Sequence, residues 1–204
     1  MISAKDVQKL RQATGAGMMD AKKALQEVDG DFEKASRLLL EKGIADARKR
    51  GERAQGQGSV GVYIHKQADR PVLGVLVELA AETDFVAKSE EFQRAANDLA
   101  MHVAAANPRW RTREEVPPDA IEAEKELITA QARNEGKSDD IISKMVEGKL
   151  KSFYQDYVLY EQTFVNPDRF EGTVGEMVEQ LSSAMGENIG VTQFARLAVG
   201  GRPS

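Results

Sequence analysis

The stretch TGAGMMDAKKAL, residues 14–25, places two glycines one residue apart directly before a predicted helix. Such glycines can cradle a phosphate, because backbone N–H groups approach the anion and the helix dipole attracts it. A dinucleotide-binding motif would need a preceding strand and a third glycine where this chain has Asp20, whereas residues 7–12 have helical spacing. No Gly-Lys-Ser/Thr sequence follows either. Gly15 and Gly17 are therefore predicted to reverse the chain between two helices with positive φ angles.

Two adjacent methionines, Met18 and Met19, follow these glycines at the entrance of the helix. Neighbouring side chains on a helix point in different directions, so both cannot enter the core of a small helical bundle. Flexible thioethers suit the apolar groove of a partner protein. Two interpretations stay open: a contact with a partner, or one buried methionine beside one that is incidentally exposed.

A second candidate site lies in ELAAETDFVAKSEEF, residues 78–92. Here Asp84, Phe85 and Val86 occupy a short link between a predicted buried strand and a predicted amphipathic helix. Because such links run over the surface, Phe85 either folds back as a staple against the helix or projects as a wedge. Asp84 could be a metal ligand, but a metal needs several converging oxygens, and its neighbour Glu82 is not sufficient.

Enzymatic chemistry has little support in the composition. The chain has no cysteine and two histidines, and no Gly-x-Ser-x-Gly elbow accompanies them. His65 falls in a predicted strand and His102 in a predicted helix, where structural roles are commoner. The 33 acidic residues are scattered along helix faces. We therefore predict a protein that is not an enzyme and that holds no cofactor and no metal.

Charge and hydropathy narrow the remaining classes of partner. The net charge is −5, and acidic residues outnumber basic ones beyond the N-terminal quarter. This charge balance argues against nucleic-acid binding. The basic stretch at residues 47–53 could be an RNA-binding tail, although a solvated linker is the commoner role. The longest nearly apolar run, residues 71–81, is far shorter than the roughly 20 residues that span a membrane. No signal peptide is evident at the N-terminus, so we expect a cytoplasmic protein without membrane contact.

Apolar residues recur at helical spacing three times before residue 45. Ser3 and Asp31 are predicted to cap the first and third of these helices, and Gly43 to end the third. Residues 45–58 are charged and rich in Gln and Gly, which is typical of a linker or a fraying helix. The N-terminal part is thus predicted to be a three-helix domain followed by a linker.

From Ser59 the apolar period changes to two. Val60, Val62 and Ile64 alternate with other residues, KQADRP turns the chain, and residues 72–80 return as a more buried strand, which predicts a β-hairpin. The later helices are predicted to begin at the capping residues Ser89, Asp119, Ser138 and Thr173, and Thr173 and Glu176 have the spacing of a capping box. The stretch NEGK, residues 134–137, is predicted to separate the two middle helices. Gly186 is predicted to end the last helix, before a final strand at residues 188–199.

These elements predict an α+β fold with a small, mainly antiparallel three-stranded sheet and flanking helices. The predicted division is a three-helix domain at 1–44, a charged linker at 45–58, an α+β core at 59–200 and a tail at 201–204.

Two stretches together are similar to one known family. LRQATGAGMMDAKKAL and ETDFVAKSEEF resemble the two signature segments of bacterial elongation factor Ts, the guanine-nucleotide exchange factor of elongation factor Tu. YEQTFV at 160–165 and GENI at 186–189 also match. The resemblance runs from about residue 3 to residue 199 and is to the short form of the family.

The resemblance implies a ubiquitin-associated-like (UBA-like) N-terminal domain and a core that carries exchange activity. It implies that Arg11, Met18 and Met19 dock on the nucleotide-binding domain of elongation factor Tu, in its GDP-bound and nucleotide-free states. It further implies that Asp84 and Phe85 reach toward the magnesium site of that partner, with Phe85 inserting between two partner side chains.

By the same resemblance, Val86, Met185 and Gly186 belong to the surface that binds elongation factor Tu. Short forms of the family are expected to be homodimers joined through their cores, in some cases by a cysteine whose matching position here is Ala195. The sequence departs from the family at Thr163, which stands for a proline. It departs again at Thr192 and Gln193, which stand for an arginine pair, and both departures put contacts near the last strand in doubt.

Overall fold

The computed structural model describes residues 2–14, 16, 18–51 and 53–201, and of residues 40 and 43–50 it describes the backbone only. The predicted reversal at Gly15 and Gly17 lies outside the described residues. Within the described ranges, every helix is too short or too polar to cross a lipid bilayer.

Three helices occupy the N-terminal part, namely α1 (Ala4–Thr14), α2 (Met18–Glu27) and α3 (Phe32–Gly51). They bury a common apolar cluster: Val7, Leu10, Ala21, Ala24, Leu25, Ala35 and Leu39. The predicted caps are confirmed, because the hydroxyl of Ser3 accepts the N–H of Asp6 at 3.1 Å and the carboxylate of Asp31 accepts the N–H of Lys34 at 3.0 Å. These side chains satisfy N–H groups that the first helical turn leaves without partners.

The prediction that Gly43 ends the third helix is wrong, because α3 continues to Gly51. A glycine inside a helix costs only about 1 kcal/mol relative to alanine. The residues that follow it include alanines, lysine and arginines, which are good helix formers. Helix therefore extends into the segment that composition alone assigned to a linker or a fraying helix.

The predicted antiparallel sheet is present, with strands β1 (Gln57–Gln67), β2 (Arg70–Ala81) and β3 (Gly190–Ala198) in the order β1-β2-β3. β1 and β2 form the predicted hairpin, whose two turn residues Ala68 and Asp69 have positive φ. The N–H of Val199 donates to the carbonyl of Val72 at 2.9 Å and continues the pairing of β3 with β2. The α+β class is thus confirmed.

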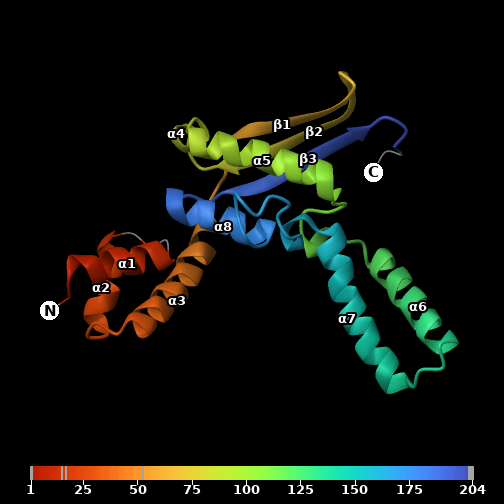
Figure 1. Ribbon diagram of the computed structural model, residues 1–204, viewed down its shortest axis with the longest axis horizontal. Coiled ribbons are helices and arrows are strands. Elements are labelled where there is room, and N and C mark those ends of the chain that lie inside the picture. Colours follow the sequence, from red (N-terminus) through yellow and green to blue (C-terminus); the bar gives the residue numbers. More distant parts are fainter. Residues whose placement is uncertain (1, 15, 17, 52, 202–204) are drawn as a thin grey trace. The chain divides into compact units, whose positions relative to one another are not determined.

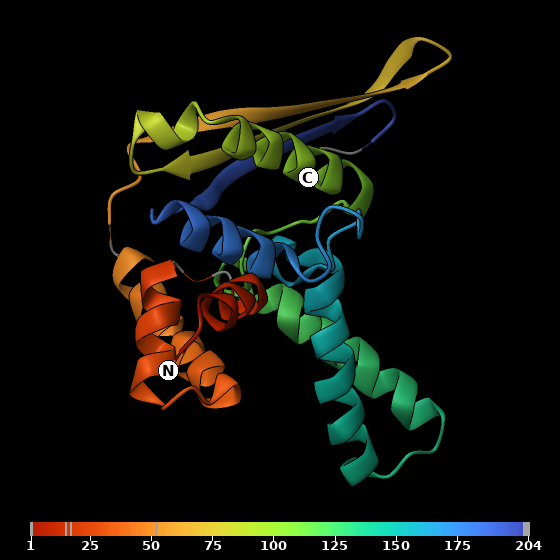
Figure 2. The same cartoon turned by 60° about the vertical axis from the view of Figure 1, so that its left-hand side comes forward.

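Helix α5 (Glu90–Ala106) lies along one face of the sheet (Figures 1 and 2). The backbones of α5 and β1 lie close together at Gly61, where an added Cβ would lie 1.9 Å from the carbonyl oxygen of Ala96. The N–H of Val62 donates to Oδ1 of Asn97 at 3.0 Å, which joins the strand to the same turn of the helix. Glycine therefore occupies the covered face of β1, and the apolar side chains of that strand point away from α5.

Two long helices, α6 (Pro118–Asn134) and α7 (Asp139–Tyr157), lie side by side as an antiparallel hairpin (Figures 1 and 2). A short turn at 135–138 joins them, close to the predicted link at 134–137. A second apolar cluster is centred on Val116, Phe153 and Val158 near the base of the hairpin. The cap predicted at Asp119 is wrong, because the helix begins one residue earlier with Pro118, whose fixed φ suits a first turn.

The remaining predicted caps differ in outcome. Ser89 and Thr173 accept N–H groups of α5 and of α8 (Val174–Met185), at 3.3 and 3.2 Å, and Glu176 completes the predicted capping box by accepting the N–H of Thr173. Ser138 holds the capping position of α7, but its side chain makes no capping hydrogen bond.

The chain divides into two compact units. One comprises the described residues of 1–59, 79–93 and 178–192, and the other those of 60–78, 94–177 and 193–201. All the predicted partner-binding residues belong to the first unit. Our division of the chain at residues 44, 58 and 200 remains a prediction.

Candidate functional site

The segment after β2 forms a four-residue helix, α4 (Asp84–Ala87), where we predicted a surface link. Thr83 precedes it with an extended backbone, and its hydroxyl accepts the N–H of Val86 at 3.4 Å. Val86 and Ala87 are buried. The helix thus has one side fixed against the protein and one side left to solvent.

Phe85 lies on the solvent side of α4 and is 83% exposed. The staple interpretation is therefore wrong, and the ring projects from the surface. The exposed ring forgoes the stabilisation that burial in its own protein would provide, and its apolar surface is available to pack against another molecule.

Asp84, beside this ring, is exposed and forms an ion pair with Lys88, 2.6 Å from Oδ2 to Nζ. The hydrogen bond from Lys88 holds the pKa of this carboxyl below its usual range, so Asp84 is a carboxylate at neutral pH. Among the described residues, no three His, Asp or Glu side chains converge to hold a metal ion.

The start of α4 is held by Glu187, which is distant in sequence. Oε2 of Glu187 accepts the backbone N–H groups of Glu82 and Thr83, at 3.0 and 3.1 Å, and Oε1 accepts the hydroxyl of Thr83 at 2.5 Å. In return, Oε1 of Glu82 accepts the backbone N–H of Asn188 at 2.6 Å. We call these four residues, Glu82, Thr83, Glu187 and Asn188, the carboxylate clamp.

The clamp also reaches the end of α3. The side-chain amide of Asn188 donates to the carbonyl oxygens of Gly51 and Arg53, at 3.4 and 2.7 Å, and the guanidinium of Arg53 lies 3.4 Å from Glu82. Arg53 is therefore engaged in a protein contact, and most of the basic stretch 47–53 continues a helix.

Gly186 makes the turn that delivers Glu187 to the clamp. It follows the last residue of α8 with a φ of +73°, as predicted for a helix-ending glycine, and its N–H donates to the carbonyl of Ser182. The hydroxyl of Ser182 donates to the carbonyl of Glu187. Met185, the last residue of α8, is half-buried, and Gly186 is exposed.

The other predicted contact residues lie on the N-terminal helices. Met18 and Met19, at the start of α2, are 51% and 63% exposed, so the interpretation with one buried methionine is wrong. Arg11 is exposed in the last turn of α1. In the described part of the chain, no hydrogen bond or ion pair joins these residues to Asp84 or Phe85.

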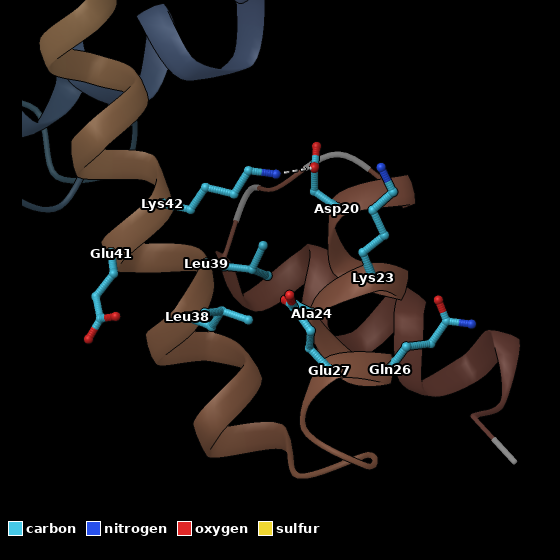
Figure 3. A pocket seen from close by; sticks show the side chains of 9 residues that line it. All are labelled: Asp20, Lys23, Ala24, Gln26, Glu27, Leu38, Leu39, Glu41 and Lys42. Atoms are coloured by element: carbon cyan, nitrogen blue, oxygen red, sulfur yellow. Dashed lines mark hydrogen bonds and ion pairs between the residues drawn. The ribbon is translucent and has the colours of Figure 1, made fainter.

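A groove of about 700 Å³ lies between α2 and α3 (Figure 3). Ala24, Leu38 and Leu39 form its apolar lining. Lys42 reaches from α3 to Asp20 at one end, 2.7 Å between Nζ and Oδ1, and this bond lowers the pKa of Asp20. None of the predicted contact residues lines the groove.

Sequence reasoning missed the carboxylate clamp. Glu82 entered the sequence analysis only as a possible metal ligand, and Glu187 only as part of a matching motif. A usable signal was present, since an acid followed by Thr precedes α4 and an acid followed by Asn follows the helix-ending glycine. Only the fold shows that these two pairs, about a hundred residues apart, meet each other.

Comparison with known proteins gives a consistent result. A family model described as "Elongation factor TS" matches residues 44–201. Elongation factor Ts of Thermosipho melanesiensis is 48% identical over 200 residues, which cover 98% of this chain and 100% of the relative. Elongation factor Ts of Fervidobacterium nodosum is 48% identical over 199 residues, 98% of each chain, and that of Acetivibrio thermocellus is 46% identical over 201 residues, 98% and 91%. The chain belongs to the elongation factor Ts family.

At the two places where the resemblance implied departures from the family motifs, Thr163 and Gln193 have local structural partners. Thr163 forms an isolated antiparallel bridge with Thr173, next to the capping box of α8. Gln193 on β3 donates to Oε2 of Glu78 on β2 at 2.8 Å. Both residues therefore support elements of this member of the elongation factor Ts family, independently of any partner.

Proposed function

We propose that this protein is a guanine-nucleotide exchange factor for elongation factor Tu, acting in translation elongation without covalent chemistry. Membership of the elongation factor Ts family supports the reaction class. The observation that carries the proposal is the exposed ring of Phe85, held on a short capped helix and facing solvent.

In the proposed mechanism, Phe85 inserts into the nucleotide-binding domain of elongation factor Tu and displaces the packing that holds its magnesium ion. Asp84 enters beside the ring as a carboxylate, close to the site of the cation. Loss of the cation leaves the phosphate charge of GDP less compensated, so the nucleotide dissociates faster. Factor and nucleotide each favour a different state of the partner, so each weakens the binding of the other by the same factor.

Arg11, Met18 and Met19 form the proposed docking surface on the N-terminal helices. Met18 and Met19 are both at least half exposed at the start of α2, and such flexible thioethers suit an apolar patch of the partner. Met185 and Gly186 are assigned to the same interaction next to the clamp. Val86 is only 8% exposed, so its proposed contribution is to anchor α4 rather than to cover much partner surface.

We also propose a homodimer that forms through the sheet. The face of the sheet opposite α5 carries six large, exposed apolar side chains, which we call the outer sheet face: Val60, Val62, Ile64, Leu76, Leu197 and Val199. Their exposed fractions run from 48% to 80%. A contiguous apolar patch of this kind is typical of a protein interface, and a second copy offers the same apolar chemistry. Ala195 lies on β3, as Leu197 does, and because alanine has no thiol no disulfide can form at that position.

The dimer has a direct test in light scattering coupled to size exclusion. The wild type is expected at twice its chain mass, and Leu76→Glu at one chain mass, because the new charge would be buried without a partner. Glu179→Ala, an exposed change on α8, is the control and should leave the dimer intact. A monomeric wild type at micromolar concentration would refute this part of the proposal.

The exchange function is tested with elongation factor Tu loaded with fluorescent GDP. Adding the protein with excess unlabelled GDP should accelerate fluorescence loss in proportion to its concentration. A rate equal to spontaneous release would overturn the assignment. Binding without acceleration would instead favour an adaptor that docks through its helical domain.

A further inference from the structure

We propose that Glu187 is a positioning residue for the exchange step, and that its carboxylate fixes the first turn of α4 and so holds Phe85 outward. This inference rests on the exchange function proposed above. Glu187 does not have to touch elongation factor Tu in this role. It acts through Thr83 and the backbone of α4.

A four-residue helix needs such support. It is too short to be stable by its own hydrogen bonds, because nucleating a helix is unfavourable and few bonds follow. Its geometry therefore depends on its cap. The hydroxyl of Thr83 accepts the N–H of Val86 and donates its own proton to Glu187, so a single chain of hydrogen bonds runs from Glu187 into α4.

Three donors from the two residues that precede α4 converge on the carboxylate of Glu187. Two are backbone N–H groups of consecutive residues, Glu82 and Thr83, at the point where β2 gives way to α4. Hydrogen bonds to a charged acceptor are roughly twice as strong as neutral ones. The direction of the chain at this junction, and with it the direction of Phe85, is set by that carboxylate.

The return bond from Asn188 to Glu82 makes the arrangement reciprocal. Each side of the clamp supplies one carboxylate: Glu187 accepts two backbone N–H groups from the other side, and Glu82 accepts one. Because the positive φ of Gly186 aims Glu187 at this junction, the turn after α8 and the start of α4 must adopt their geometries together. Phe85 itself is mostly exposed and makes few contacts that could orient it, so the orientation must come from this backbone framework.

The test compares Glu187→Ala, Glu187→Gln and the control Glu179→Ala in the fluorescent-GDP assay with elongation factor Tu. Glu187→Ala should lower the maximal exchange rate about tenfold or more, with the half-saturating concentration changed less than about threefold. Glu187→Gln should recover most of the rate, because its amide oxygen can still accept both backbone N–H groups. A wild-type rate for Glu187→Ala would overturn the inference.

A double-mutant cycle with Phe85→Ala separates positioning from direct partner contact. If Glu187 acts through the ring, Glu187→Ala should have no further effect once the ring is removed. An equal loss in both backgrounds would show a role that does not pass through Phe85 and would overturn the inference.

A measurement without the partner distinguishes failure of this inference from failure of the proposed function. In Glu187→Ala the amide protons of Glu82 and Thr83 should exchange with solvent at least about tenfold faster, whatever the protein binds. Unchanged protection would refute positioning, even if exchange activity is confirmed. If Glu187→Ala does not fold, Thr83→Val, which removes the hydroxyl and keeps the shape, should lower the maximal rate in the same way.

Discussion

Replacing Phe85 by alanine removes the exposed ring with little effect on the protein's own fold. The side chain is 83% exposed. With about 200 Å² for a phenylalanine and about 25 cal/mol per Å², complete burial of the exposed part in a partner would contribute about 4 kcal/mol. Roughly a sixth of the ring is buried in the free protein, so the cost to folding stability is below about 1 kcal/mol.

These magnitudes set the expected kinetics. A loss of 4 kcal/mol in the transition state corresponds to about a thousandfold in rate, and a loss of half that to about thirtyfold. We expect Phe85→Ala to lower the maximal exchange rate by about 30- to 1000-fold. Affinity for nucleotide-free elongation factor Tu should fall less than the rate, by less than about tenfold, because we expect the wedge to serve the transition state more than the docked complex.

The assay is release of fluorescent GDP from elongation factor Tu at saturating factor, with binding measured separately by calorimetry. Phe85→Leu retains apolar volume without a planar ring and should fall between the wild type and Phe85→Ala. Glu90→Ala, an exposed change in the first turn of α5, is the control for surface substitution. If Phe85→Ala exchanges within threefold of the wild type while its melting temperature is unchanged, the ring is not the wedge.

Three further predictions concern other parts of the molecule. Gly61→Ala would place a Cβ against the backbone of α5 and should lower the free energy of unfolding in urea by about 1–3 kcal/mol. The control is Gly148→Ala in α7, where the added Cβ meets open space and should not destabilise the protein. Burial lowers the pKa of His102, whose ring accepts the N–H of Val165 and contacts a glutamine amide, so the folded protein binds a proton less readily than the unfolded chain. The contribution of the neutral His102 ring to the free energy of unfolding should therefore be fully present above about pH 6.5 and decrease as the pH falls below it. An NMR titration showing a protonated ring in the folded protein at pH 6.5 would contradict this. Met18→Ala and Met19→Ala should each weaken association with elongation factor Tu by about 1–3 kcal/mol in calorimetry, at unchanged melting temperature; unchanged affinity in both would remove them from the interface.

Local patterns predicted most of the secondary structure, because they depend on neighbours in the chain. Apolar period, capping residues and helix-ending glycines were enough for the N-terminal helices, the β-hairpin, the capping box at Thr173 and the end of α8 at Gly186. The failures also have local causes. Gly43 reads as a helix end by itself, but the strong helix formers after it outweigh one glycine.

The candidate site divides in the same way. The sequence by itself determined the family and the segment that carries Asp84 and Phe85, because both are recorded in contiguous motifs. Whether the ring was buried or exposed, which face of β1 met α5, and that Glu187 holds the start of α4 were decided only by the tertiary structure. Each of these depends on contacts between residues far apart in the chain. A local sequence pattern does not determine which distant residue a side chain contacts or in which direction it points.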